Sequence, residues 1–534
     1  MLFLEGKMYQ RTVEYIKEVD PLRLVLPGIR SRDSARRKHS IELVCQRANE
    51  LARDRKSEIL KSHLPVILQL ATVCPFEDVR KEFTRLLEEL KKCGEKVPRR
   101  VYGGPSSFIP TKQVTPLNGN KEDTDSLLTE SFLASGRLTH VHWLMAYHPQ
   151  YLECFLNTHF YLMRQEGPLL FNWRCYIAIM AASRHRCCYL VRLYESEFLK
   201  NKGDPSWLNG LDQIPKKLYN LHTINKILAH QPWLVSFENM KELREGEDSW
   251  SLSELVQAIT ILIHFHCLSS FVFGCGLTPE VDLEGGHTFR PPSLTSEHSE
   301  DGVSTTLDEG RSAAGKEFVA LMNAVTQKHK NQDKVNVEKT LEEFESIASD
   351  EVFSMSYSDD SCAIPEDTFA RYIKDPTFRY KNFADRIDRH QYLNINEYSW
   401  EGYGFSLVDR FYPEMGQLLD DKLRVCESLT YNTCGFDSET ADTRTFRQAT
   451  WNYIHVLFGV YHDDYRYDEV NSLMDRDYKS YIKKVVCYPE RTTQEDYLNF
   501  IQSLTHSEKV HINLIAFEAR MQAELLYALR AIMR

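Results

Sequence analysis

The 534-residue sequence lacks several features that define large classes of protein. No uninterrupted apolar run reaches the roughly 18 residues that a membrane span needs. The most apolar stretch, 252–275, is broken by Glu254 and by two histidines. The start of the chain is apolar only as far as Leu4, so we expect no secretory signal. We therefore expect no membrane span, and the 42% hydrophobic and 26% charged content is typical of a globular protein.

Motifs that hold metals and nucleotides are also missing. The 13 cysteines include no Cys-x-x-Cys pair, which argues against a structural zinc site and favours free thiols in a reducing compartment. A Glu-x-x-His step at 508–511 has its only counterpart in a glycine-rich segment at 284–287, so we reject a diiron site. There is no phosphate-binding glycine loop, dinucleotide fingerprint or nucleophile elbow. We expect no metal and no cofactor.

The net charge of −11 is unevenly distributed. Residues 1–100 hold 22 Lys and Arg against 15 Asp and Glu, so the remainder is strongly acidic. An acidic body argues against nucleic acid as a partner. The basic start could contact an acidic partner or an anionic surface, or it could be a solvated helical face.

Apolar residues recur at three- and four-residue steps through most of the chain, which predicts an all-α fold. Two segments rich in Pro, Gly, Ser and acidic residues interrupt this pattern and are expected to be linkers. Ser251 and Glu254 form a capping-box sequence at the start of the most apolar helix. The predicted parts are a helical N-terminal extension (1–96), a linker (97–125), a helical domain (126–277), an acidic disordered linker with a charged helix (278–372) and a second helical domain (373–534).

A cysteine follows a basic run in the first helical domain. Arg184, His185 and Arg186 precede Cys187, and positive neighbours are expected to lower a cysteine pKa and favour the reactive thiolate. Tyr189 could donate a hydrogen bond to a leaving oxygen. This pattern is typical of a thiol that attacks a peroxide. The alternative is that Cys187 is a small, inert core residue.

A second group of residues suits a free amino acid. A helix is predicted to begin at Thr443, and Arg447 lies one turn later on the same face. The first amides of a helix and a guanidinium together bind a carboxylate. Glu508, at the start of the last helix, could bind an ammonium group. The alternative is a structural ion pair between Arg447 and Glu508.

The stretch Asp463 to Glu469 combines acids and tyrosines after Gly459 and is expected to be an exposed turn. Paired acids beside tyrosines suit recognition by a basic partner. A solvated loop is the alternative.

The blocks that carry these residues resemble one known family. PSSFIP, YIAIMAASRH, INKILAHQPWL, WSLSELVQA, LSSFVFGCG, LTYNT, DDYRYDEVN, YIKKVVCYPERTT and EARMQAELLYALRAIMR are similar to the sestrins, in order. The resemblance implies two helical domains similar to alkylhydroperoxidase D, joined by a disordered linker. It implies a stress-linked inhibitor of TOR signalling that binds the activating GATOR subcomplex and other TOR-pathway regulators, in the cytoplasm and also the nucleus. It further implies leucine as a regulatory ligand and a peroxide-reducing activity.

The resemblance also assigns roles to individual residues. The peroxidatic cysteine and its tyrosine correspond to Cys187 and Tyr189, but the family's histidine is Tyr194 here, so an alkyl hydroperoxide reductase remains the alternative function. A family tryptophan on the floor of the leucine pocket is replaced by Ile501. The partner-binding residues correspond to Ser251, Asp463 and Asp464. The leucine-binding residues correspond to Thr430, Tyr431, Thr433, Thr443, Phe446, Arg447, Ile501, Glu508 and His511.

Overall fold

The computed structural model describes residues 22, 26–53, 57–97, 104–117, 119, 122–282, 319–325, 327, 367–383, 392–429 and 442–533. The chain divides into two compact units. Unit 1 comprises residues 1–105, 114–149 and 279–295, and unit 2 comprises residues 106–113, 150–278 and 296–534.

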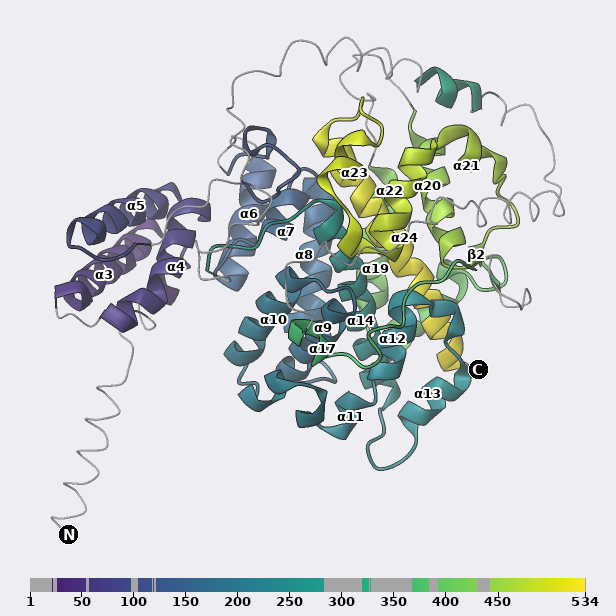
Figure 1. Cartoon of the computed structure of the whole chain (residues 1–534), viewed down its shortest axis with the longest axis horizontal. Coiled ribbons are helices and arrows are strands. Elements are labelled where there is room, and N and C mark those ends of the chain that lie inside the picture. The colour runs from purple at the N-terminus through teal and green to yellow at the C-terminus, as the bar shows by residue number, and fades with distance from the viewer. Residues whose placement is uncertain are drawn as a thin grey trace. The chain divides into compact units, whose positions relative to one another are not determined.

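Unit 1 is a small helical assembly (Figure 1). Its best example of helical patterning is α5, where Val79, Phe83, Leu86 and Leu90 lie at three- and four-residue steps and are all buried. Helices α3 and α4 pack against α5 around one apolar core. The elements are η1 (Leu26–Ile29), α3 (Ser34–Arg53), α4 (Ser57–Val73), α5 (Glu77–Lys92), α6 (Glu122–Ser135) and α7 (His140–Met145).

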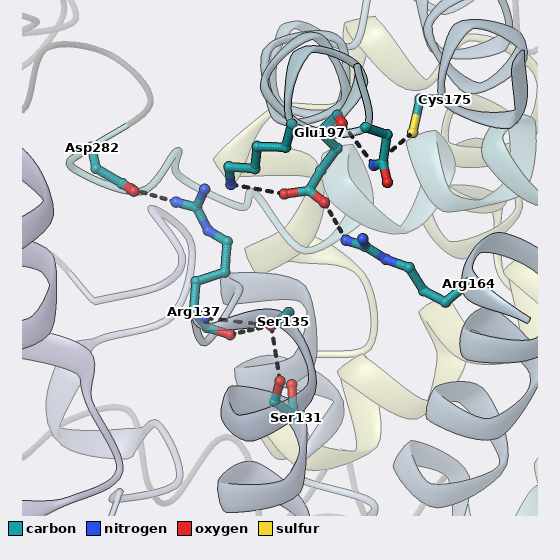
Figure 2. A network of polar contacts seen from close by, with 9 residues as sticks. Ser131, Ser135, Arg137, Arg164, Cys175, Glu197 and Asp282 are labelled. Carbon is teal, nitrogen blue, oxygen red and sulfur yellow. Dashed lines mark hydrogen bonds and ion pairs between the residues drawn. The ribbon is translucent and has the colours of Figure 1, made fainter. Parts of the chain in front are cut away.

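Polar contacts secure the end of unit 1 that includes residues 279–282. The Arg137 guanidinium pairs with the Asp282 carboxylate, and the Ser135 hydroxyl donates to the carbonyl of Ser131 at 2.9 Å (Figure 2). The backbone N–H of His140 donates to the Glu280 carboxylate at 2.7 Å. These bonds satisfy polar groups that burial would otherwise leave without partners.

Unit 2 contains the longest helices of the described chain (Figure 1). Its elements before the long gap are η2 (Thr111–Gln113), α8 (Pro149–Arg164), α9 (Phe171–Arg184), α10 (Cys188–Lys200), η3 (Pro205–Asn209), η4 (Leu211–Gln213), α11 (Lys216–Tyr219), α12 (His222–His230), η5 (Pro232–Leu234), α13 (Phe237–Arg244) and α14 (Leu252–Gly274). Those after it are α17 (Asp367–Ala370), β1 (Leu393–Asn394), the π-helical turn η8 (Trp400–Gly404), α18 (Phe405–Phe411), α19 (Met415–Ser428), α20 (Arg444–Leu457), β2 (Val460–Tyr461), α21 (Asp468–Leu473), α22 (Arg476–Cys487), η9 (Pro489–Arg491), α23 (Gln494–Asn499) and α24 (His506–Met533).

Helices α14 and α24 form the centre of unit 2 and pack along each other. Figure 1 shows the yellow α24 running beside α20 and α22. By length and composition, α14 is the described helix that could cross a membrane, but its most apolar 18-residue window is 100% buried inside the protein. That burial is what a core helix requires. The capping box predicted at its start is present, since Ser251 Oγ accepts from the Glu254 N–H and Glu254 Oε2 accepts from the Ser251 N–H.

The interface between α14 and α24 also buries charge. Arg520 pairs with Glu524 at 2.6 Å, and Glu524 accepts from His266 Nδ1 at 2.9 Å. Arg520 also donates to the Ser270 hydroxyl and to the carbonyls of Ala229 and Val486. Buried ions need this degree of pairing, because an unpaired one is strongly destabilising.

The only strands among the described residues form a short parallel pair. Leu393 lies opposite Val460 and Asn394 opposite Tyr461, so this pair joins the segment before η8 to the end of α20. The all-α prediction is confirmed. Residues 319–325, inside the segment predicted to be a charged helix, are helical.

The structure differs from the sequence prediction around residues 97–125. Residues 122–125 form the first turn of α6, and Ser106 donates to the carbonyl of Cys275 at 2.6 Å. Although this stretch is rich in proline and glycine, its residues 106–113 are therefore a packed segment that lies in unit 2. Helices from both predicted domains also lie in unit 2.

Candidate functional site

Three helix ends meet around Cys426 in unit 2. His511, one residue into the second turn of α24, donates from Nε2 to the carbonyl of Cys426 at 3.0 Å, near the end of α19. The Cys426 thiol also lies close enough to Arg447, in the first turn of α20, to influence the pKa of that guanidinium. The carboxyl end of α19 and the amino ends of α20 and α24 are therefore brought together at one place.

Arg447 lies in this place as a buried cation. Burial lowers its pKa, and the nearby Cys426 and Asp442 oppose that change. Its side chain is 8% exposed, and its Nε has no hydrogen-bond partner among the described residues. The Thr443 hydroxyl, one turn earlier, is also buried and has no described partner. Donors that are desolvated and unsatisfied are suited to an anionic ligand such as a carboxylate.

The predicted alternative was an ion pair between Arg447 and Glu508, but the charges that act on the pKa of Arg447 are those of Cys426, Asp442, Arg444 and Glu427. Glu508 instead caps the start of α24. Its Oε2 accepts from the N–H and hydroxyl of Thr505, both at 2.7 Å, and the Glu508 N–H donates to the Thr505 hydroxyl. The Thr-x-x-Glu spacing is a capping-box signal that the sequence prediction overlooked. The Glu508 carboxylate thus closes the first turn of α24.

An apolar wall of buried aromatic rings includes Phe446, the residue before Arg447 in α20. The rings of Phe446 and Tyr478 lie 5.2 Å apart, and Phe500 lies 5.8 Å from Tyr478. Ile501 follows Phe500 with φ at 33°, a left-handed conformation that β-branched residues rarely adopt. Phe446 therefore links this apolar wall to the turn of α20 that carries Arg447.

The sequence identified part of this site. Thr443, Phe446, Arg447, Glu508 and His511 are all buried in unit 2. The contributions of Cys426, Tyr478 and Phe500 were missed, because a backbone carbonyl and aromatic rings from other helices have no local sequence signal. The predicted ligand residues that lie outside the described residues are Thr430, Tyr431 and Thr433.

The predicted acidic turn is held more firmly than its sequence suggests. Asp463 accepts hydrogen bonds from Asn394 and Asn396, while Asp464 is exposed. Tyr465 and Tyr467 are buried, so the tyrosines do not share the predicted exposure of the acids. The tyrosine rings pack inward, whereas Asp464, next to Tyr465, is left in solvent.

The surroundings of Cys187 do not lower its thiol pKa, in contrast to what the preceding basic run predicted. Cys187 is 0% exposed, and burial raises the pKa of its thiol to about 12 against the weaker effects of backbone amides and the Ser269 hydroxyl. Arg184 does not assist it, because its guanidinium donates to the carbonyls of Lys374, Asp375 and Phe378. His185, which lies between them, contacts Arg520. The catalytic assignment of Cys187 and Tyr189 stays a prediction.

Tyr194, which stands where the resemblance expects a histidine, belongs to a buried polar chain. Its hydroxyl lies 2.9 Å from His159 Nε2, and His159 Nδ1 lies 3.0 Å from His264 Nε2. Burial lowers the pKa of His264 well below its usual value, so this ring is neutral. His159 on α8 thus contacts Tyr194, the tyrosine that stands in place of the histidine implied by the resemblance.

Figure 2 shows a further network in unit 2, on the second half of α10. Glu197 pairs with Arg164 and with Lys200, and Asn201 donates to the Cys175 sulfur at 3.8 Å. Burial alone would raise the pKa of Glu197, but Lys200 and Arg164 outweigh it and lower the pKa. The network joins α8, α9 and α10. No group of three or more metal-binding side chains occurs among the described residues.

The family model described as "PA26 p53-induced protein (sestrin)" matches residues 104–534. The chain belongs to the sestrin family. It is 44% identical to Sestrin-1 of Macaca fascicularis over 458 residues, covering 83% of this chain and 93% of that protein. It is also 44% identical to Sestrin-2 of Homo sapiens, covering 82% and 92%, and to Sestrin-3 of Mus musculus, covering 82% and 93%.

The matched region of this sestrin includes both the candidate ligand site around Arg447 and the acidic turn at Asp463 and Asp464. Helices α3, α4 and α5 precede residue 104 and lie outside it. The membership is consistent with a stress-induced regulatory protein.

Proposed function

We propose that this sestrin is an amino-acid-responsive inhibitor of TOR signalling, with leucine or a close apolar relative as its ligand. The observation that carries this proposal is Arg447, a buried guanidinium with no described partner at its Nε, beside the unsatisfied Thr443 hydroxyl. A ligand carboxylate would satisfy both groups. The Phe446–Tyr478–Phe500 wall would contact an apolar side chain, and the acid Glu508 lies one helical turn before His511 on α24.

The proposal includes a protein partner, the activating GATOR subcomplex, bound through Asp463 and Asp464 and with a contribution from Ser251. Support comes from the exposure of Asp464 and Ser251 and from the family membership. Ligand binding would release this partner. The proposed location is the cytoplasm.

A thermal-shift titration of the purified chain against each proteinogenic amino acid tests the ligand. A ligand at a hundredfold excess over its Kd should stabilise the chain by about 2.7 kcal/mol. The shift should occur with leucine or a close relative and disappear in Arg447→Met. Arg444→Met is the matched control, since Arg444 is exposed on the same helix and should leave the shift intact. Absence of a shift with every amino acid would refute the proposal.

Capture of the GATOR subcomplex by the full chain tests the partner. Asp464→Ala should lose the complex. Leucine should release it from the unsubstituted chain and not from Arg447→Met. Release that is unaffected by Arg447→Met would separate partner binding from this ligand site.

A further inference from the structure

The acidic turn is fixed to the neighbouring segment, residues 392–404. Asn394 Nδ2 donates to Asp463 Oδ2 at 3.3 Å, and Asn396 Nδ2 donates to Asp463 Oδ1. The β1–β2 pair holds the two backbones in register directly beside these contacts. Asp463 is thus an anchored carboxylate, and Asp464 next to it is presented to solvent in a defined position.

The same segment carries a pair of stacked aromatic rings, of which Tyr398 is half-buried and Tyr403 is exposed. The Tyr398 N–H donates to the carbonyl of Asn394, which places Tyr398 one turn from the anchor. The rings of Tyr398 and Tyr403 are stacked 5.2 Å apart at 11°, and Tyr403 is 47% exposed. The Tyr398 hydroxyl lies 3.7 Å from the sulfur of Met533, which is 52% exposed. Large apolar groups exposed together mark interaction sites more often than isolated ones do.

The charge around these rings is negative. Glu397 and Glu401 are exposed on the same segment as the tyrosines. Arg466, within the acidic turn, is already paired with Asp468 at 2.9 Å. Arg530 lies near Tyr398, where its charge opposes the rise in the tyrosine pKa that burial causes. One half-buried arginine does not balance the four carboxylates of Asp463, Asp464, Glu397 and Glu401.

We propose that this acidic–aromatic surface, formed by Glu397, Tyr398, Tyr403, Asp463, Asp464 and Met533, docks an arginine-bearing basic segment of a partner protein. One arginine stacks on the outer face of Tyr403 and another pairs with Asp464. The inference rests on the proposed partner role of the two aspartates and extends it to a second recognition element. Asn394 and Asn396 act as positioning residues, because they hold Asp463 and hence the turn.

Arginine fits this surface better than lysine. A planar guanidinium stacks on an aromatic face and donates two parallel hydrogen bonds to a carboxylate, whereas an ammonium is a compact and more strongly hydrated charge. A stacked cation at an exposed site is worth about a fivefold change in affinity. The surface should therefore discriminate between the two basic side chains.

Fluorescence anisotropy of a short labelled Gly-Ser peptide with two arginines, titrated with the full chain, tests this. The arginine peptide should bind more tightly than the same peptide with lysines. Tyr403→Ala should weaken it about fivefold, Asn396→Ala should weaken it, and Tyr403→Phe should keep it. Phe160→Ala, which removes an aromatic side chain 49% exposed on α8, is the matched control and should change nothing. No binding, or equal binding by Tyr403→Ala, would overturn the inference.

Parallel capture of the GATOR subcomplex separates this inference from the proposed function. If Asp464→Ala loses the complex and Tyr403→Ala retains it in full, the proposed partner role stands and the arginine-docking inference fails. If the arginine peptide shows the expected pattern but no variant affects capture of the complex, the surface stands and the proposed partner is wrong.

Discussion

The imidazole of His511 donates a 3.0 Å hydrogen bond to the backbone carbonyl of Cys426. The two residues are 85 positions apart in the chain, and both are buried. The bond fastens the first turns of α24 to the end of α19, and Arg447 on α20 lies against the same cysteine. The geometry of the candidate ligand site therefore depends on a contact that involves no ligand-binding charge.

His511→Ala should lower the free energy of unfolding by about 1–3 kcal/mol, because it leaves a buried carbonyl unsatisfied and creates a small cavity. Urea denaturation of the full chain measures this. Gln448→Ala, an exposed position on α20, should leave stability unchanged. Equal midpoints for the two variants would mean that the hydrogen bond contributes nothing to the stability of the site.

Breaking the buried ion pair of Lys422 and Glu518 should cause a large loss of stability. Both side chains are 0% exposed and lie 3.0 Å apart, and Tyr151 also donates to Glu518. Lys422→Met should destabilise the chain by about 3–5 kcal/mol at neutral pH, since it leaves an unpaired buried carboxylate. Burial already raises the pKa of Glu518, and loss of Lys422 should raise it further.

The sign of the pH dependence provides the check on Lys422. A carboxyl group whose pKa is raised in the folded chain lowers the free energy of unfolding at pH values above its ordinary pKa of 4.5. The loss of stability in Lys422→Met should therefore be present at neutral pH and shrink as the pH falls. Adding Glu518→Gln should restore part of the lost stability. A deficit that persists unchanged at low pH, or that deepens in the double variant, would contradict this account.

The largely buried imidazole of His462, beside the proposed docking surface, should make the stability of the folded chain sensitive to acid. Burial lowers the pKa of its imidazole from 6.5 to about 4, although Asp464 and Asp463 oppose that shift. Between these values the unfolded chain binds a proton that the folded chain does not, so stability should fall as the pH falls. One such proton corresponds to about 1.4 kcal/mol per pH unit, or up to about 3 kcal/mol over the window.

Denaturation midpoints measured from pH 7 to pH 4 check the contribution of His462. His462→Gln should flatten the profile by up to one proton. His39→Gln, at an exposed position on α3, should leave the profile as it is. Parallel profiles for His462→Gln and the unsubstituted chain would show that His462 does not supply this sensitivity.

The buried thiol of Cys187 should be unreactive in the folded chain. Alkylation by iodoacetamide at pH 7.5, followed by mass spectrometry of each peptide, should label Cys187 roughly tenfold or more slowly than the exposed Cys93. The two rates should converge in urea. Rapid native labelling of Cys187, or its fast oxidation by an organic hydroperoxide, would instead favour the peroxidase alternative.

The sequence by itself determined the helical fold and several positions of its elements. The three- and four-residue apolar periodicity of α5 and the Ser251–Glu254 capping box require only neighbouring residues, and both are present in the structure. The start of the last helix and the grouping of Thr443 with Arg447 were likewise visible, because residues one helical turn apart must share a face.

Tertiary structure determined how far the functional residues are buried and which hydrogen-bond partners they have. The basic run before Cys187 suggested a thiolate, yet Arg184 contacts carbonyls near residue 375 and burial dominates the thiol pKa. The Cys426 carbonyl, the Tyr478 ring and the Asn396 anchor of Asp463 come from segments distant in sequence. Desolvation and long-range hydrogen bonds depend on which helices pack together, and local sequence patterns do not contain that information.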